Sequence, residues 1–221
     1  MGWEMLSCRY GVSICDTASQ EDIGSVTTEH VSREELEARL AAYERRERRR
    51  RWPRITLVVV AALVALTAGD WWLRNWEMHN LLTKVEASEK PMATARDGMS
   101  GLVQAHAGEQ LTTEEINTVR ASMAQIAEHG ATGVITTGDE VGVVTVAPWH
   151  RGIAEAKTRY VAHSDAWRRH LTAIAADPDT YGHGGADISG TFLSAENASK
   201  EAIPMFALYD LRERIDTIFA D

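Results

Sequence analysis

Histidine, aspartate and serine are the residues of this chain that could do chemistry. Seven of the eight histidines follow residue 75. His163 and His170 stand seven apart in one helical pattern, which separates them by roughly 10 Å, too far to chelate one metal ion. His183 and Asp187 lie in a Gly/Asp-rich stretch whose spacing matches neither an EF-hand loop nor a zinc motif. We therefore predict no metal site, with His183 and Asp187 as the weak candidate for a divalent cation.

Nucleophile and phosphate-binding motifs are the next possibility. The glycines between Gly130 and Gly142 are not followed by Gly-Lys-Ser/Thr and do not form Gly-x-Gly-x-x-Gly. No Gly-x-Ser-x-Gly elbow occurs, so nothing predicts that serine, histidine and aspartate converge. The sequence thus predicts no catalytic residues, no cofactor and no enzymatic activity.

A basic stripe is the remaining candidate site. It lies in the helical pattern from Trp149 to Leu171, within an otherwise acidic region, and consists of Arg151, Lys157, Arg159, Arg168 and Arg169. These cations could bind an anionic ligand or a partner protein. Alternatively, they pair with acidic residues on neighbouring helices.

Charge and cysteine content narrow the function classes. From residue 75 onward there are 12 Lys/Arg against 21 Asp/Glu, a formal net charge of −9. An acidic domain of this kind is not expected to bind nucleic acid. Both cysteines, Cys8 and Cys15, precede the apolar segment, so we expect no disulfide in the part that follows it.

The apolar segment determines the predicted organisation. Ile55–Ala68 is uninterrupted, and extension to Leu73 gives 19 residues, close to the roughly 30 Å of a bilayer core at about 1.5 Å per residue. We predict one transmembrane helix over 52–73. The interface residues would be Arg48, Arg49, Arg50, Arg51, Trp52, Trp71, Trp72 and Trp76, because arginines and tryptophans favour that region.

Orientation follows from the arginines. Seven of them lie in Arg45–Arg54, which by the positive-inside rule places residues 1–51 in the cytoplasm and 74–221 outside. A cleaved signal sequence is the main alternative, but about 50 residues precede the apolar run, far more than an ordinary n-region. We favour a retained signal-anchor in the cell membrane, and a soluble protein is the third possibility.

The flanking regions are predicted to be mainly helical. Residues 1–30 have no periodicity and are expected to be disordered, whereas 32–51 should form a charged helix with a short coiled-coil-like stripe. Beyond the span, Met78, Val85, Met92 and Met99 recur every seven residues. These methionines could accept a soft metal or a flexible partner surface, and core packing or a stalk–stalk contact is the alternative that we favour. Pro91 interrupts this stripe, where we expect a kink or a new helix.

Three further helices are predicted. The second begins at the Thr112–Glu115 capping box and ends at Gly130, the third covers Trp149–Ile174, and the fourth runs from Ser194 or Ala198 to Phe219. The β-branched residues of 133–147 predict a small hairpin, and 177–190 an irregular loop. The fold class is therefore all-α in the main: one transmembrane helix, then an extracytoplasmic bundle of about four helices with a β-hairpin insertion.

Function can be predicted only as a class. The layout resembles, in architecture alone, the anchored helical sensor modules of bacterial receptors, but their second span and signalling domain have no counterpart here. We expect a single-pass, non-enzymatic interaction or scaffold protein of the cell envelope, whose partners are the lipid bilayer and an envelope protein or a second copy of the chain. The alternative is an extracytoplasmic sensor or binding module for a small anionic ligand or ion.

Overall fold

The computed structural model describes residues 32–220. By its internal contacts the chain divides into residues 1–58 and 59–221, and each unit is considered by itself. The prediction of disorder for 1–30 lies outside the described residues. In the first unit helix α1 (Arg33–Ala105) begins after Ser32, whose hydroxyl accepts a hydrogen bond from the Glu35 amide at 3.3 Å. Leu36, Leu40 and Tyr43 are exposed on this charged helix.

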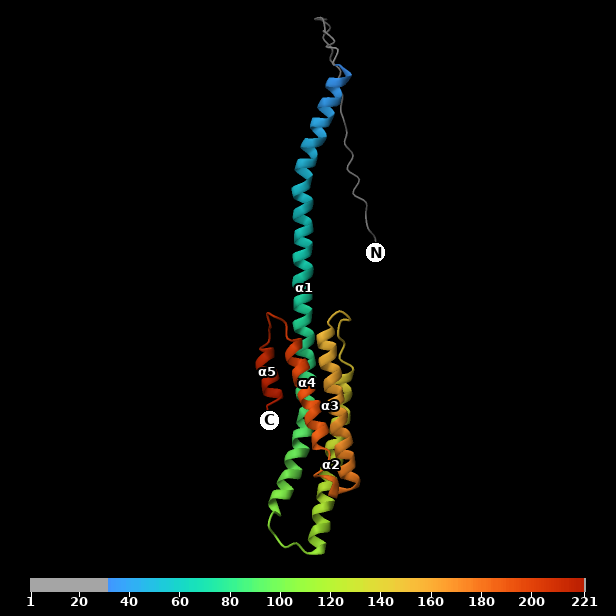
Figure 1. Ribbon diagram of the computed structural model, residues 1–221, viewed down its shortest axis with the longest axis vertical. Helices are drawn as coiled ribbons and strands as arrows, with labels where there is room; N and C mark the ends of the chain where they lie inside the picture. Colours follow the sequence, from blue (N-terminus) through green and yellow to red (C-terminus); the bar gives the residue numbers. More distant parts are fainter. Residues whose placement is uncertain (1–31, 221) are drawn as a thin grey trace, which may run out of the picture. The chain divides into compact units, whose positions relative to one another are not determined.

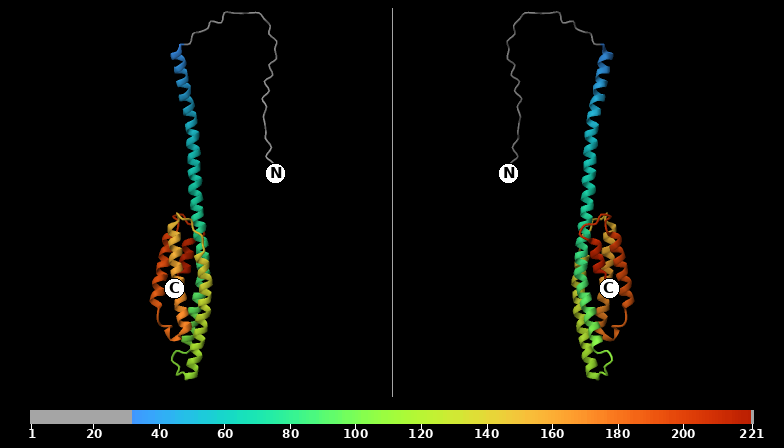
Figure 2. Two further views of the ribbon diagram at one scale, coloured as in Figure 1. Left: turned by 90° about the vertical axis from the view of Figure 1, so that its right-hand side faces the viewer. Right: turned by 90° about the vertical axis from the view of Figure 1, so that its left-hand side faces the viewer.

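The second unit is an up-down bundle built entirely of helices in the part that the structure describes. The rest of α1 is followed by α2 (Thr113–Gly142), α3 (Arg151–Ala176), the 3-10 turn η1 (Pro178–Thr180), α4 (Gly185–Ala202) and the short α5 (Leu211–Ile218). Figures 1 and 2 show α2, α3 and α4 lying alongside the lower half of α1, with successive long helices running in opposite directions. The prediction of a mainly α-helical fold is confirmed.

The apolar segment of α1 is not part of the bundle core. Its large side chains are exposed from Ile55 to Leu66, and no residue of its most apolar 18-residue window is buried. By length and composition, α1 is the one helix among the described residues that could cross a membrane. Within residues 32–220 no other element covers these side chains.

Two apolar clusters fill the bundle. One lies around Met78, Leu82, Ile153 and Tyr160, and the other around Met92 and Met99 with residues of α2 and α3. Met78, Met92 and Met99 are at most 1 % exposed. The methionine stripe therefore packs in the core, where unbranched side chains fill irregular gaps between helices.

The predicted β-hairpin over 133–147 is wrong. Helix α2 continues through Gly142, and a loop without strands leads to α3. The physical reason lies in spacing: Val134 and Val141 are seven apart, so the same β-branched residues also form one helical stripe, and both are buried. Tertiary packing of that stripe outweighs the β propensity of the individual residues.

The glycines of α2 also differ from expectation. The expectation that α2 ends at Gly130 is wrong, because Gly130 is a close-packing position inside the helix. A Cβ atom built there would lie 2.6 Å from the Cβ of Ala95, and one at Gly133 would lie 2.7 Å from the Cβ of Pro91. Both glycines allow α2 to approach α1, which runs unbroken through Pro91.

The C-terminal region also differs from expectation. The loop predicted over 177–190 contains η1 and the first turns of α4, and the predicted fourth helix is two helices, α4 and α5, separated by residues 203–210. Ile203 precedes Pro204 and is extended, at φ −60° and ψ 128°. A residue before proline is sterically disfavoured in the helical region, and this ends α4.

Candidate functional site

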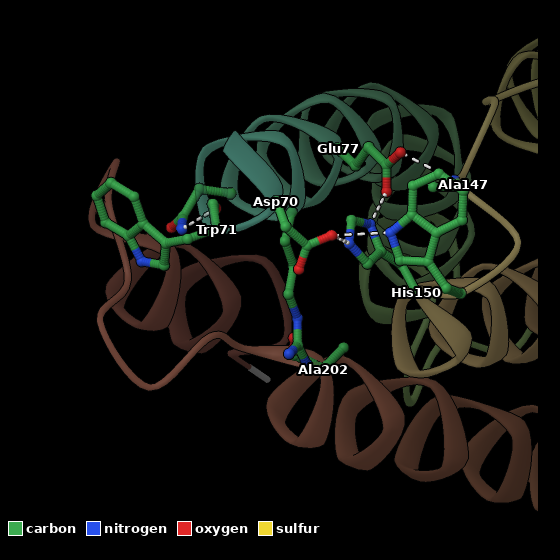
Figure 3. Close-up of polar contacts among 9 residues, drawn as sticks. Asp70, Trp71, Glu77, Ala147, His150 and Ala202 are labelled. Atoms are coloured by element: carbon green, nitrogen blue, oxygen red, sulfur yellow. Dashed lines mark hydrogen bonds and ion pairs between the residues drawn. The ribbon is translucent and has the colours of Figure 1, made fainter. Parts of the chain in front are cut away.

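A cluster of polar side chains lies where α1 leaves its apolar segment. Asp70 and Glu77 are seven residues apart on α1, so two helical turns place them on the same face. His150, the N-cap residue of α3, lies against both of them. Its Nδ1 is 2.6 Å from Glu77 Oε2 and its Nε2 is 3.1 Å from Asp70 Oδ1, as Figure 3 shows. Together with Trp149, these three residues form what we name the junction cluster.

The histidine of the cluster is almost completely buried. Its side chain is 4 % exposed, that of Glu77 is 5 % exposed, and Asp70 is half exposed. Each ring nitrogen of His150 faces a carboxylate oxygen. Glu77 Oε1 also accepts a hydrogen bond from the Ala147 amide at 2.8 Å. The polar atoms of this buried group are thus paired, as burial requires.

Two loops are fastened to α1 here, one by the junction cluster and the other by Trp71 and Asn75. Trp149 Nε1 donates to Asp70 Oδ1 at 2.8 Å, which together with His150 fixes the loop between α2 and α3. Trp71 Nε1 donates to the Phe206 carbonyl at 2.7 Å, and the buried Asn75 accepts from the Leu208 amide at 2.6 Å. The second pair of contacts fixes the loop between α4 and α5.

The contacts of the junction cluster are structural and do not form a reactive site. The imidazole is enclosed and both of its nitrogens are engaged, so it presents no free lone pair to a substrate. The carboxylates of α1 instead accept hydrogen bonds from the loop between α2 and α3 and from the N-cap residue of α3. Hydrogen bonds to a charged group are shorter and stronger than neutral ones. These bonds join α1, at the end of its apolar segment, to the loop before α3 and to the N-cap residue of α3.

Exposed apolar side chains surround this end of the bundle. Met205 is 92 % exposed, Phe206 72 % and Trp149 63 %, and Trp72 and Trp76 on α1 are about half exposed. Trp149 and Phe206 reach the apolar end of α1 through the hydrogen bonds to Asp70 and Trp71. Aromatic residues next to an apolar helix are typical of the membrane–water interface.

Sequence reasoning did not single out Asp70, Glu77 or His150 as site residues. One signal was present: two acidic residues seven apart immediately after an apolar run. The partner of that pair could not be found from the sequence, because His150 follows 73 residues after Glu77 and its partners depend on tertiary packing.

The basic stripe is largely engaged by neighbouring groups. Arg159 pairs with Glu155 at 2.6 Å and Arg168 with Asp165 at 3.0 Å, both on α3 itself. Arg169 pairs with Asp187 of α4 at 3.4 Å. Lys157 donates to the carbonyl of Val144 at 3.1 Å. Arg151 is exposed in the first turn of α3.

The weak metal candidate is divided between two elements. His183 lies in the turn before α4, whereas Asp187 is in the first turn of α4 and pairs with Arg169. Among residues 32–220 no group of three or more His, Cys, Asp or Glu side chains is arranged to hold a metal ion.

The predicted interface residues fall in both units. Arg48 to Trp52 lie on α1 in the first unit, where Trp52 is exposed, and Trp71, Trp72 and Trp76 lie on α1 in the second. No protein-family model, curated protein or solved structure matches the chain.

Proposed function

We propose that this chain is a single-pass, non-enzymatic interaction protein of the cell envelope, anchored in the membrane by α1. Its helical bundle rests on the membrane–water interface at the extracytoplasmic side and binds a partner in a membrane complex. The observation that carries the proposal is the junction cluster together with the exposed apolar side chains around it. Exposed apolar surface next to an apolar helix is stable when lipid covers both.

The apolar segment supports the anchor. Its side chains are exposed along the helix. Their transfer from water into a bilayer would be favourable by about 0.8 kcal/mol for each CH₂ group buried. Loops fixed to α1 by Asp70, Trp71 and Glu77 hold Trp149 and Phe206 close to the end of that segment. A bundle held this way presents its sides, and not its apolar end, to proteins outside the membrane.

Two surfaces of the chain support the proposal that it binds a partner protein. Leu36, Leu40 and Tyr43 are exposed at i, i+4 and i+7, a spacing that suits helix pairing on the cytoplasmic side. On the other side of the membrane, the unlike charges along α3 suit a polar protein surface better than lipid, because its cations are balanced by nearby acids.

The anchor and its orientation can be tested with cysteine labelling in intact cells. The native Cys8 and Cys15 should resist a membrane-impermeant maleimide until the cells are opened. In a chain with both replaced by serine, Ala107→Cys, exposed in the turn after α1, should be labelled from outside. The opposite pattern would reverse the orientation, and recovery of the protein in the soluble fraction would remove the anchor.

The partner requires a separate experiment. Crosslinking in native membranes followed by capture of the tagged full chain should recover one protein at constant stoichiometry, or a second copy of the chain. The control is a chain in which Leu36, Leu40 and Tyr43 are replaced by serine, which separates tail-mediated pairing from binding by the bundle. Recovery of no constant partner from either chain would contradict the interaction role.

A binding module for a small ligand is the second candidate function, because the bundle contains a cavity between α1, α3 and α4 beside His163.

A further inference from the structure

A cavity of about 490 Å³ lies between α1, α3 and α4, within the range of about 300–1,000 Å³ typical of ligand pockets. Its walls are mostly apolar and include Met92, Met99, Trp167 and Phe192. The partly buried carboxylate of Glu89 on α1 and the buried imidazole of His163 on α3 also line it. It is separate from the junction cluster, since the two share no residue.

The hydrogen bonds of His163 define which ring nitrogen is free. His163 is 1 % exposed, and its Nδ1 lies 3.1 Å from the hydroxyl oxygen of Thr191. That hydroxyl donates its own proton to backbone carbonyls of α4, at 3.0 Å to Asp187 and 2.9 Å to Ile188. The oxygen therefore accepts from Nδ1–H, which leaves Nε2 with a lone pair. Nε2 has no hydrogen-bond partner.

Glu89 presents a second acceptor to the same place. Its Oε1 lies 3.8 Å from His163 Nε2, too far for a direct hydrogen bond. The same oxygen accepts a hydrogen bond from the buried Tyr160 hydroxyl at 2.8 Å. Burial lowers the pKa of His163 to about 4, so the ring is neutral near pH 7 and donates nothing toward Glu89. Two acceptors thus face each other with no donor between them.

A ligand with a donor group would satisfy both acceptors. A cation is favoured over a neutral donor because burial raises the pKa of Glu89, and a positive charge beside it would compensate the carboxylate. The adjoining cavity shares Glu89 and is lined by Glu86, Asp210 and Glu213 as well, against Lys90 and Arg214. Arg96 also lines the cavity and pairs with Asp97 at 3.4 Å; its charge lowers the pKa of Glu89, but burial outweighs this effect.

We propose that this cavity binds a small organic amine, whose ammonium group donates hydrogen bonds to Glu89 and to His163 Nε2 while its apolar part lies against Met92, Met99 and the aromatic rings. Trp167 and Phe192 suit a cationic ligand because the face of an aromatic ring attracts positive charge. This site goes beyond the anchoring role and does not depend on it.

Binding is tested on the full chain purified in a non-ionic detergent. The probes are 2-phenylethylamine, 2-phenylethanol and 3-phenylpropanoate, which share a ring and differ in the charge of the head group. Saturation-transfer NMR and the fluorescence of the tryptophans report binding, and empty micelles correct for partitioning. We expect the amine to bind at least tenfold more tightly than the alcohol, and the carboxylate not to compete.

Two matched variants identify the site. Glu89→Gln keeps an acceptor for Tyr160 but removes the charge, and His163→Asn keeps the donor to Thr191 but removes Nε2. Each should weaken amine binding at least tenfold, whereas Glu140→Gln, an exposed residue of α2, should leave it unchanged. Thermal melting verifies that each variant is folded. Equal binding by all three variants, or preferential binding of the carboxylate, would overturn the proposal.

A measurement on the wild-type chain covers the case in which a variant does not fold. The ¹⁵N shifts of labelled histidine distinguish an Nε2 lone pair from a protonated or hydrogen-bonded nitrogen. Amine, but not alcohol, should shift the His163 Nε2 signal in a saturable manner. An unchanged signal at saturating amine would exclude the site while leaving the membrane anchor untouched.

Discussion

His163 predicts an acid sensitivity that can be worked out from the structure. Burial lowers the pKa of this imidazole from 6.5 to about 4. Between these two values the unfolded chain takes up a proton at His163 and the folded chain does not. The contribution of His163 to the free energy of unfolding is therefore complete above pH 6.5 and is lost as the pH falls toward 4.

The size of this loss follows from the difference of about 2.5 between the pKa of His163 in the unfolded and in the folded chain. At roughly 1.4 kcal/mol per unit, the full loss is about 3 kcal/mol, a large part of the about 5–15 kcal/mol of a typical domain. Glu89, which faces His163 from α1, acts with the opposite sign. Burial raises the pKa of Glu89, so the folded state gains stability relative to the unfolded state as the pH falls through the folded pKa. Tyr160 keeps its proton throughout, since burial raises its pKa well above 10.

The assay compares two chains that differ only at His163. Both carry Glu89→Gln, which removes the opposing titration, and one also carries His163→Asn. Guanidinium unfolding in non-ionic detergent, followed by helical circular dichroism between pH 7.5 and 4, yields the free energy of unfolding at each pH. We expect the difference between the chains to change by about 3 kcal/mol over this range. His129→Asn, at an exposed site, is the control.

A difference that stays constant with pH would refute the reasoning, because it would mean that His163 titrates alike in the folded and unfolded chains. A difference that changes in the other direction would mean that folding favours the imidazolium, and that His163 pairs with a charged group in the fold.

Three further predictions concern other parts of the chain. Glu77→Ala should lower the free energy of unfolding by about 3–5 kcal/mol, since it leaves the buried His150 ring nitrogen and the Ala147 amide without their acceptor, whereas Glu77→Gln, which retains an acceptor, should cost less in the same denaturation assay. Gly130→Ala should cost about 1–3 kcal/mol because its Cβ would lie 2.6 Å from that of Ala95; adding Ala95→Gly should restore part of the loss, and Gly142→Ala, which meets no atom within 4 Å, should be neutral or stabilising. Leu63→Arg at the middle of the apolar segment should disfavour insertion by about 3 kcal/mol, read as a smaller fraction of the chain resistant to carbonate extraction; an unchanged fraction would place this residue outside a bilayer.

Local signals predicted the starts of α2 and α3 well. The Thr112–Glu115 capping box forms as expected, with the Glu115 carboxylate 2.7 Å from the Thr112 amide, and α3 covers nearly the predicted range. These features depend on residues within one or two turns of each other, and such contacts can be read from spacing alone.

Signals of helix ends failed where packing gives a residue another role. Gly130 was expected to end a helix and Gly133 to begin a hairpin. Both lie inside α2, where it approaches α1 closely. Nothing local distinguishes a glycine that ends a helix from one that allows two helices to touch. The same limit applies to Val134 and Val141, whose spacing fits a helix although their types favour a strand.

The sequence by itself determined the helical class of the fold and the apolar segment of α1, because periodicity and composition are properties of consecutive residues. An acidic pair, Asp70 and Glu77, stands next to that segment, but no local pattern marked it as a site. Only the tertiary structure brought His150 between Asp70 and Glu77, and His163 opposite Glu89, since these partners are separated by more than 70 residues along the chain. A helical pattern shows which residues share a face, whereas the element that the face meets is decided by how the helices pack.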